Sequence, residues 1–453
     1  MTSTQERTIA AGALRSEATQ RVTPAGCESV REMTERLASY LSPEDQTVQS
    51  MPDASPTKWH RAHTSWFFET FLLGPFRPGY RAYEEAYGYL FNSYYEAVGS
   101  RHPRPRRGMI TRPGIAEIAA YRDHVDAELA SLVAGRRFEE AASLVELGLH
   151  HEQQHQELLL MDAKHLLSMN PLSPAYRGGS ARGGERGAGT GGPAPAPGIA
   201  SDAWIASDAW IASDGGIIEV GHEGGGFCFD NECPRHGVLL RPFELAAELA
   251  TSGEYLAFMA DGGYSRPELW LSEGWARVQG EGWRAPLYWV EQDGEWLQLT
   301  LDGMRPVAAA EPVCHVSLYE ADAFARWSGA RLPTEAEWEV VAAGRAVTGN
   351  FLDGASGSAL GSSALHPVPA AGRAQSLFGD VWQWTSSSYG PYPGYRPAEG
   401  AVGEYNGKFM VNQYVLRGGS CVTPAGHVRA TYRNYFPASA RWAFSGVRLA
   451  RGT

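Results

Sequence analysis

Histidines at helical spacing are the residues of this chain best suited to chemistry. His151 and His155 stand four apart in HHEQQHQELLL (150–160), so a helix would present both imidazoles on one face. His63 lies in a second candidate helix, SPTKWHRAHTSWFFETFLL (55–73). Three neutral imidazoles from two helices suit a first-row transition metal and leave coordination positions open for substrate and oxygen. The pattern favours a metal-dependent enzyme over two surface histidines on an amphipathic helix.

Four candidate helices would position these histidines. They cover residues 27–41, 55–73, 115–134 and 138–167. Their mostly short connections predict an antiparallel four-helix bundle over 23–170, preceded by a flexible N-terminus, 1–22. The long connection 74–112, rich in Tyr, Pro and Arg, is a functional-loop candidate by its length.

The second half of the chain differs from the first in composition and in expected secondary structure. Residues 171–215 contain a Gly/Pro/Ala stretch and an IASDAW repeat, which we interpret as an expanded flexible linker. From 216 to 453, short strands and turns predominate, including a hairpin with Asp293-Gly294 at its turn. A helix at 317–330 precedes a second one, whose capping box uses Thr334 and Glu337. This region predicts an irregular α+β domain, and the fold class of the chain is α+β.

Composition narrows the function. The chain has 453 residues, enough for two cores, and its formal net charge of −12 argues against binding nucleic acid or an anionic membrane. No apolar run reaches the length of a membrane span, so we expect a cytoplasmic protein. The five cysteines include no C-x-x-C pair, which argues against a disulfide framework and a thiolate zinc site. Cys228 and Cys233 could lie close in the fold, although buried free thiols are the default.

Several motifs resemble known families. ARLPTEAEWE (330–339), GDVWQWTSS (379–387), VLRGGSC (415–421) and FSGVRLA (444–450) resemble the formylglycine-generating-enzyme-like domain, an irregular C-type-lectin-like fold. SPTKWHRAH and HEQQH are similar to DinB-like four-helix bundles that carry a three-histidine metal site. The combination resembles the non-haem iron sulfoxide synthases of ergothioneine and ovothiol biosynthesis, and their relative selenoneine synthase. Trp338, Trp382 and Trp384 within these motifs are expected to brace the core.

The resemblance implies a reaction and its cofactor. It implies that His63, His151 and His155 bind Fe(II). The small-molecule substrates would be hercynine (the Nα-trimethylated histidine), O2 and a thiol or selenium donor. The implied reaction joins sulfur or selenium to the imidazole carbon of hercynine.

The resemblance also implies substrate contacts. Gln154 matches a residue that hydrogen-bonds the substrate imidazole. RNYFPASARW (433–442) matches the segment that lines the hercynine pocket, with Asn434 at the carboxylate or ammonium region. Tyr435 would offer an aromatic face to the trimethylammonium group, which has no hydrogen to donate. Phe436 and Arg441 of the same segment complete the expected substrate-binding set.

Departures from the family pattern concern the donor and the catalytic tyrosine. Relatives that use γ-glutamylcysteine carry an acidic residue and an arginine where this chain has Phe436 and Ala440, which favours free cysteine or a selenium compound. Those relatives place a catalytic tyrosine just before YNGKF, where this chain offers only Tyr405 nearby. LFNSYYEAVGSRHPR (90–104) supplies Tyr94 and Tyr95 as catalytic candidates instead. Nearby arginines are candidates for binding a charged group of the donor; they are Arg101, Arg104, Arg106 and Arg107.

Two other functions fit parts of the sequence. His151-Glu152-Gln153-Gln154-His155 also matches H-E-x-x-H, in which Glu152 would be the general base of a zinc metallohydrolase. A lectin-like binding protein tethered to a structural bundle would explain the tryptophans but would leave three histidines without a role.

Overall fold

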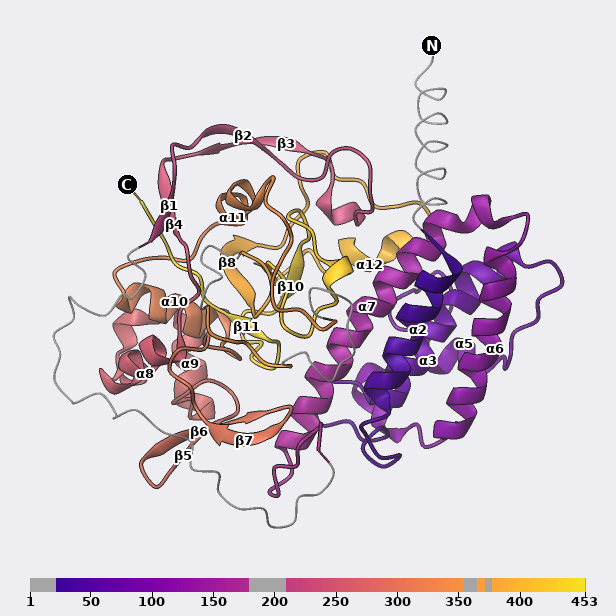
Figure 1. The fold of residues 1–453 in the computed structure, drawn as a ribbon, viewed down its shortest axis with the longest axis horizontal. Helices are drawn as coiled ribbons and strands as arrows, with labels where there is room; N and C mark the ends of the chain where they lie inside the picture. The colour runs from indigo at the N-terminus through magenta and orange to yellow at the C-terminus, as the bar shows by residue number, and fades with distance from the viewer. Residues whose placement is uncertain (1–21, 179–208, 354–364, 371–376, 453) are drawn as a thin grey trace.

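The chain folds into a helical bundle beside a larger part that contains short helices and strands (Figure 1). The computed structural model describes residues 22–178, 209–353, 365–370 and 377–452. The predicted α+β class is confirmed. The expected flexible segment 1–22, apart from its last residue, and most of the predicted linker lie outside the described residues.

Each of the four predicted bundle helices is present. They are α2 (Pro24–Ala38), α3 (Thr57–Phe68), α6 (Ile115–Val133) and α7 (Phe138–Ser168). The connection 74–112 is not a simple loop. It contains α4 (Gly74–Phe76), α5 (Tyr87–Leu90) and the 3-10 helix η2 (Arg104–Met109), and the π-helical turn η1 (Glu69–Leu73) precedes it.

The longest helix, α7, lies along the boundary between the bundle and the rest of the molecule (Figure 1). Its apolar residues on one side pack against the bundle core, which contains Trp59, Trp66 and Phe67. Leu159, Leu160 and Met161 instead pack with buried residues of the second part, such as Val422 and Phe444. Because α7 contributes to both cores, its position is fixed from both sides.

Among the described residues, the second part contains four small sheets. Its strands are β1 (Trp210–Ser213), β2 (Gly216–Val220), β3 (His236–Leu240), β4 (Phe243–Ala246), β5 (Trp289–Gln292), β6 (Glu295–Thr300), β7 (Gly303–Pro306), β8 (Trp382–Ser388), β9 (Tyr414–Arg417), β10 (Asn434–Phe436), β11 (Ser445–Gly446) and β12 (Ala450–Gly452). The central sheet has the order β10-β9-β8-β11; the others are β1-β4-β12, β2-β3 and β5-β6-β7. Helices flank these sheets: α8 (Ser252–Ala260), α9 (Ser272–Glu281), α10 (Leu318–Trp327), α11 (Glu335–Ala342) and α12 (Glu404–Gly407).

The domain boundary predicted at 171–215 requires a correction. The last copy of the repeat forms β1, which pairs antiparallel with β4 and places Ile211 opposite Leu245. Residues before the repeat also pack against the second part, since the backbone N–H of Tyr176 donates to the Leu301 carbonyl at 2.9 Å. A short β-branched and aromatic segment therefore joins a sheet edge even though its repetition suggested a linker.

Helices α8 and α9 were also not predicted.

Local signals in the second part are confirmed. Asp293 and Gly294 both adopt positive φ in the tight turn between β5 and β6. Thr334 Oγ1 accepts from the Glu337 N–H, and the Glu337 carboxylate accepts from the Thr334 N–H at 2.8 Å, which completes the capping box of α11. The tryptophans expected in the core, Trp338, Trp382 and Trp384, are all buried.

Within the described part of the chain, no helix is long and apolar enough to cross a membrane.

A close contact between α3 and α7 gives a test of the bundle. A Cβ added at Gly148 would lie 2.7 Å from Cε1 of the buried Phe68 ring. We expect Gly148→Ala to lower the free energy of unfolding by about 1–3 kcal/mol, because the two helices must separate to admit the methyl group. Chemical or thermal unfolding measures the change. Gly280→Ala is the matched control, since a Cβ at this position in α9 meets no heavy atom within 4 Å. Equal stability of Gly148→Ala and the native protein would contradict the close packing.

Candidate metal centre

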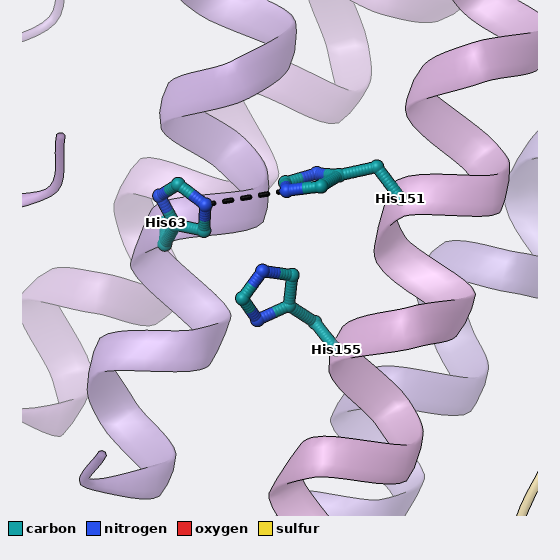
Figure 2. A group of neighbouring side chains, drawn as sticks. All are labelled: His63, His151 and His155. Atoms are coloured by element: carbon teal, nitrogen blue, oxygen red, sulfur yellow. Dashed lines mark hydrogen bonds between the residues drawn. The ribbon is translucent and has the colours of Figure 1, made fainter. Parts of the chain in front are cut away.

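Three buried imidazoles meet between α3 and α7. The ligand nitrogens of His63, His151 and His155 all lie within 4.8 Å of one another, and Figure 2 shows the rings turned toward a common point. His63 Nε2 lies 3.3 Å from His151 Nε2. The sequence predicted this group, and the structure brings together all three members from two helices separated by almost ninety positions.

Outer hydrogen bonds orient two of the three rings. His63 Nδ1 donates to the Phe91 carbonyl at 2.6 Å, which leaves Nε2 free to face the other histidines. His155 Nδ1 lies 2.8 Å from His60 Nδ1, and His60 Nε2 lies 3.1 Å from Asp162 Oδ2. Because the Asp162 carboxylate accepts from His60 Nε2, His60 Nδ1 is an acceptor, and His155 Nδ1 donates to it. His155 therefore also presents Nε2 as a lone-pair donor.

The donor set fits a divalent transition metal. Burial lowers the pKa of all three ligand histidines, with that of His151 falling to about 4, so the rings are neutral near pH 7. Neutral imidazole nitrogen is a metal ligand, and three such ligands leave open coordination positions. His151 Nδ1 is buried and has no hydrogen-bond partner among the described residues. Aromatic rings enclose the group: Trp59 stacks on His63 at 4.5 Å, and Phe67 stacks on His151 at 4.5 Å.

The zinc metallohydrolase interpretation is wrong, because Glu152 cannot be the general base that it requires. Glu152 is fully buried, and its carboxylate accepts from Arg31 at 2.8 Å, Arg122 at 2.9 Å and Thr34 at 2.7 Å. Burial alone would raise the pKa of Glu152, but the two guanidinium groups hold it below its ordinary value. A carboxylate that accepts from two arginines and a threonine is not free to act as a general base for a metal-bound water.

Two adjoining cavities lie beside the histidines. The first, of about 560 Å³, is lined by His151, Phe67, Tyr95 and residues around Phe227. The second, of about 260 Å³, is lined by Arg104 and by residues of the segment 433–442. Both cavities share part of their walls; the shared residues are Gln154, Phe229, Tyr405 and Asn406. A molecule in either cavity can thus contact Gln154, one residue before the ligand His155.

Most of the predicted substrate residues line the second cavity. Gln154 Nε2 donates to Tyr432 Oη at 2.9 Å, while its Oε1 is buried and unpartnered within the described chain. Asn434 uses its Oδ1 to accept from the Tyr435 N–H, which leaves its amide NH2 for another partner. Tyr435 stacks at 4.0 Å on Tyr389. Phe436 packs edge-to-face on Trp442, which lines the same cavity.

Arg441 is the exception and corrects the predicted substrate set. Its guanidinium binds the buried Glu320 carboxylate at 2.7 Å, donates to the Ala285 carbonyl and lies over the Trp283 ring. It lines neither cavity. Its neighbours indicate a role in holding the second part together.

The tyrosine pair is divided between the two cavities. Tyr94 lines the second cavity, and its hydroxyl accepts from Arg104 at 2.8 Å. Tyr95 lines the first cavity, and burial raises its pKa well above the ordinary value, so its hydroxyl keeps the proton. The hydroxyl of Tyr95 makes no hydrogen bond to the described residues. Tyr405 lines both cavities, with its ring 6.2 Å from that of His151.

Several residues of the site were missed at the level of sequence. His60 and Asp162 support His155; their signal was present, since His60 precedes His63 by three residues and Asp162 follows His155 by two helical turns. Glu157 lines the second cavity, where it accepts from Trp382 and Thr423. Burial raises the pKa of Glu157 to about 7, against the lowering effect of these two hydrogen bonds.

The fold and the site define a helical bundle with a candidate metal centre, joined to an irregular α+β domain, and comparisons with known proteins agree. Residues 27–159 match the DinB superfamily, and residues 200–367 and 368–453 match the sulfatase-modifying factor enzyme 1-like domain. Hercynine oxygenase of Mycolicibacterium thermoresistibile is 34% identical, covering 93% of this chain and 92% of that protein. Its Mycolicibacterium smegmatis counterpart is 32% identical, with coverage of 93% and 96%. The chain belongs to the hercynine oxygenase family.

The second part also has relatives of its own. The formylglycine-generating enzyme of Streptomyces coelicolor is 34% identical over 154 residues, which cover 29% of this chain and 45% of that protein. The predicted family is confirmed, as is the prediction of an oxygenase-type enzyme, and the lectin-like binding alternative is not retained.

The contact of His60 with His155 gives a test of the metal centre. We expect His60→Ala to weaken divalent metal binding about 10- to 100-fold, because His155 loses the acceptor that fixes its tautomer and ring orientation. His60→Asn, whose amide oxygen can replace the acceptor, should restore most of the affinity. Competitive titration against a chelating indicator measures both. Native affinity in His60→Ala would contradict the assignment.

Proposed function

We propose that this protein is a non-haem Fe(II)-dependent oxygenase that joins sulfur or selenium to the imidazole carbon of hercynine. The three converging neutral histidines carry the proposal, and the family supports the substrate. Hercynine loses a hydrogen from its imidazole carbon and the donor loses the hydrogen of its thiol or selenol. One oxygen atom of O2 is transferred to the sulfur or selenium, and the other leaves as water. When bound, Fe(II) supplies open positions for O2 and for a soft donor atom.

The second cavity is the proposed hercynine site. Gln154 Oε1, buried and unpartnered among the described residues, is available to accept from an imidazole N–H. Arg104 Nε, also buried and unpartnered there, and the Asn434 amide can donate to the substrate carboxylate. The Tyr435 ring provides an aromatic face for the trimethylammonium group, and the Glu157 carboxyl group lines the same cavity. The cavity thus has complementary groups for each part of a zwitterionic trimethylated histidine.

The first cavity is the proposed approach of the donor. Its described lining includes Glu146, Asp230 and Glu399 but no lysine or arginine. Ala440, where relatives that use γ-glutamylcysteine carry arginine, is 1% exposed, so an arginine side chain there would have no room. These observations favour a donor that does not need cationic side chains to bind the carboxylates of a dipeptide. Free cysteine and a selenosugar are such donors.

The activity itself is the main test. Purified protein is loaded with Fe(II) without oxygen, mixed with hercynine and one donor at a time, and then exposed to O2. We expect O2 uptake and a product whose mass equals hercynine plus donor with one oxygen added and two hydrogens lost. Cysteine, a selenosugar and γ-glutamylcysteine form the three arms, and His63→Ala is the inactive control. Absence of O2 uptake with every donor, together with tightly held zinc and protease activity, would overturn the proposal.

Tyr95 is the proposed proton donor of the reaction. Its protonated hydroxyl opens to the first cavity, whereas the Tyr94 hydroxyl is bound to Arg104. We expect Tyr95→Phe to lower kcat about 10²- to 10⁴-fold with little change in KM. Tyr94→Phe should mainly raise the KM for hercynine, through loss of its contact with Arg104. A large loss of kcat in Tyr405→Phe with native kcat in Tyr95→Phe would transfer the role to Tyr405.

A further inference from the structure

Two cysteines lie side by side, and one of them, Cys228, lines the first cavity. The Sγ atoms of Cys228 and Cys233 are 3.7 Å apart, and Cys228 lines this cavity together with His151. Both are partly exposed, whereas Cys27, Cys314 and Cys421 are buried. A small molecule in the cavity can therefore reach Cys228, and the partly exposed Cys233 lies beside it.

The loop that carries Cys228 has room for the two sulfurs to approach. A disulfide requires an S–S distance of about 2.05 Å, so the sulfurs must move closer than in the dithiol. Gly224 and Gly226 precede Cys228 with φ of +95° and +105°, and an added Cβ at either position would meet no heavy atom within 4 Å. The space on the Cβ side of both glycines is thus open.

The contact between the sulfurs also favours a reactive thiolate. The hydrogen bond from the Cys228 thiol lowers the pKa of Cys233, against the raising effect of burial. A thiolate attacks peroxide and sulfenic sulfur, whereas a protonated thiol does so poorly. The lowered pKa of Cys233 therefore supports oxidation of this pair of thiols, which their short separation allows.

We propose that Cys228 and Cys233 form a redox-active dithiol that reduces hydrogen peroxide at the first cavity and closes to a disulfide. The Cys233 thiolate takes an oxygen atom from peroxide, giving a sulfenic acid and hydroxide. The second thiolate displaces hydroxide from that sulfur and forms the S–S bond. In total, two thiols and one hydrogen peroxide give one disulfide and two waters. Incomplete reduction of O2 in the adjoining metal site is one source of peroxide, but the dithiol chemistry does not depend on the proposed function.

Thiol counting tests this proposal. The full-length protein is reduced, desalted, exposed to hydrogen peroxide, denatured and alkylated, and the labels are counted by intact mass. We expect the number of alkylated thiols to fall from the five of the chain to three, with the peptide containing Cys228 and Cys233 lighter by two hydrogens. Dithiothreitol should restore all five. None of these measurements needs hercynine or a donor, so failure of the proposed function leaves this test intact.

Matched variants define the outcome. In Cys228→Ser, Cys233 should give a sulfenic acid that dimedone traps, with no linked peptide, and Cys228→Ala should behave in the same way. Cys27→Ser, which removes a buried thiol, should still close the pair. The proposal is overturned if the native protein keeps five thiols, if oxidation spreads equally over all cysteines, or if Cys228 and Cys233 become sulfinic acids without linking.

Discussion

The rotation of α7 about its own axis is the constraint on which the site depends, and a buried ion cluster fixes it. Glu152 is fully buried against Arg31 and Arg122, which come from α2 and α6. Removing one partner of such a cluster strands a buried charge, at a cost of about 3–5 kcal/mol. Any rotation of α7 that separated these groups would meet this penalty. The cluster therefore holds the neighbouring His151 on the side that faces α3.

In this orientation, the period of 3.6 residues per turn gives α7 three faces, each with a different set of contacts. His151 and His155 face α3, while Glu152 and Gln156 face α2, where Gln156 donates to the Val30 carbonyl. A third face is directed at the second part of the molecule, with Gln154 bonded to Tyr432 and Glu157 to Trp382. The two histidines, the bundle contacts and the residues that face the second part thus belong to one helix. The histidine group and the second cavity are therefore linked through α7 although they lie on different faces of it.

The sequence was informative where the signal is periodic and local. Helical spacing predicted α3 and α7 together with the ligands that they carry, and turn chemistry predicted Asp293-Gly294 and the capping box at Thr334. Contacts between distant segments could not be read in this way. Glu404 accepts from the Glu96 and Ala97 N–H groups, more than three hundred positions away, and so brings Tyr405 beside Tyr95. Arg441 matched a substrate segment by position, but its direction depends on Glu320 in α10. The repeat was interpreted from its composition, and only pairing with β4 makes its last copy a strand.

The charge balance around the histidines connects the structure to the choice of donor. All three proposed ligands are neutral, so they leave the charge of a divalent metal uncompensated. Glu152 adjoins His151 in sequence, but two arginines neutralise it, and Asp162 reaches the site only through His60 and His155. Trp59 and Phe67 stack on His63 and His151 without supplying a full negative charge. Under the proposed function, a substrate would supply the anionic ligand. A thiolate or selenolate would do so with a soft atom, and the described lining of the first cavity, which contains no lysine or arginine, is compatible with such a donor.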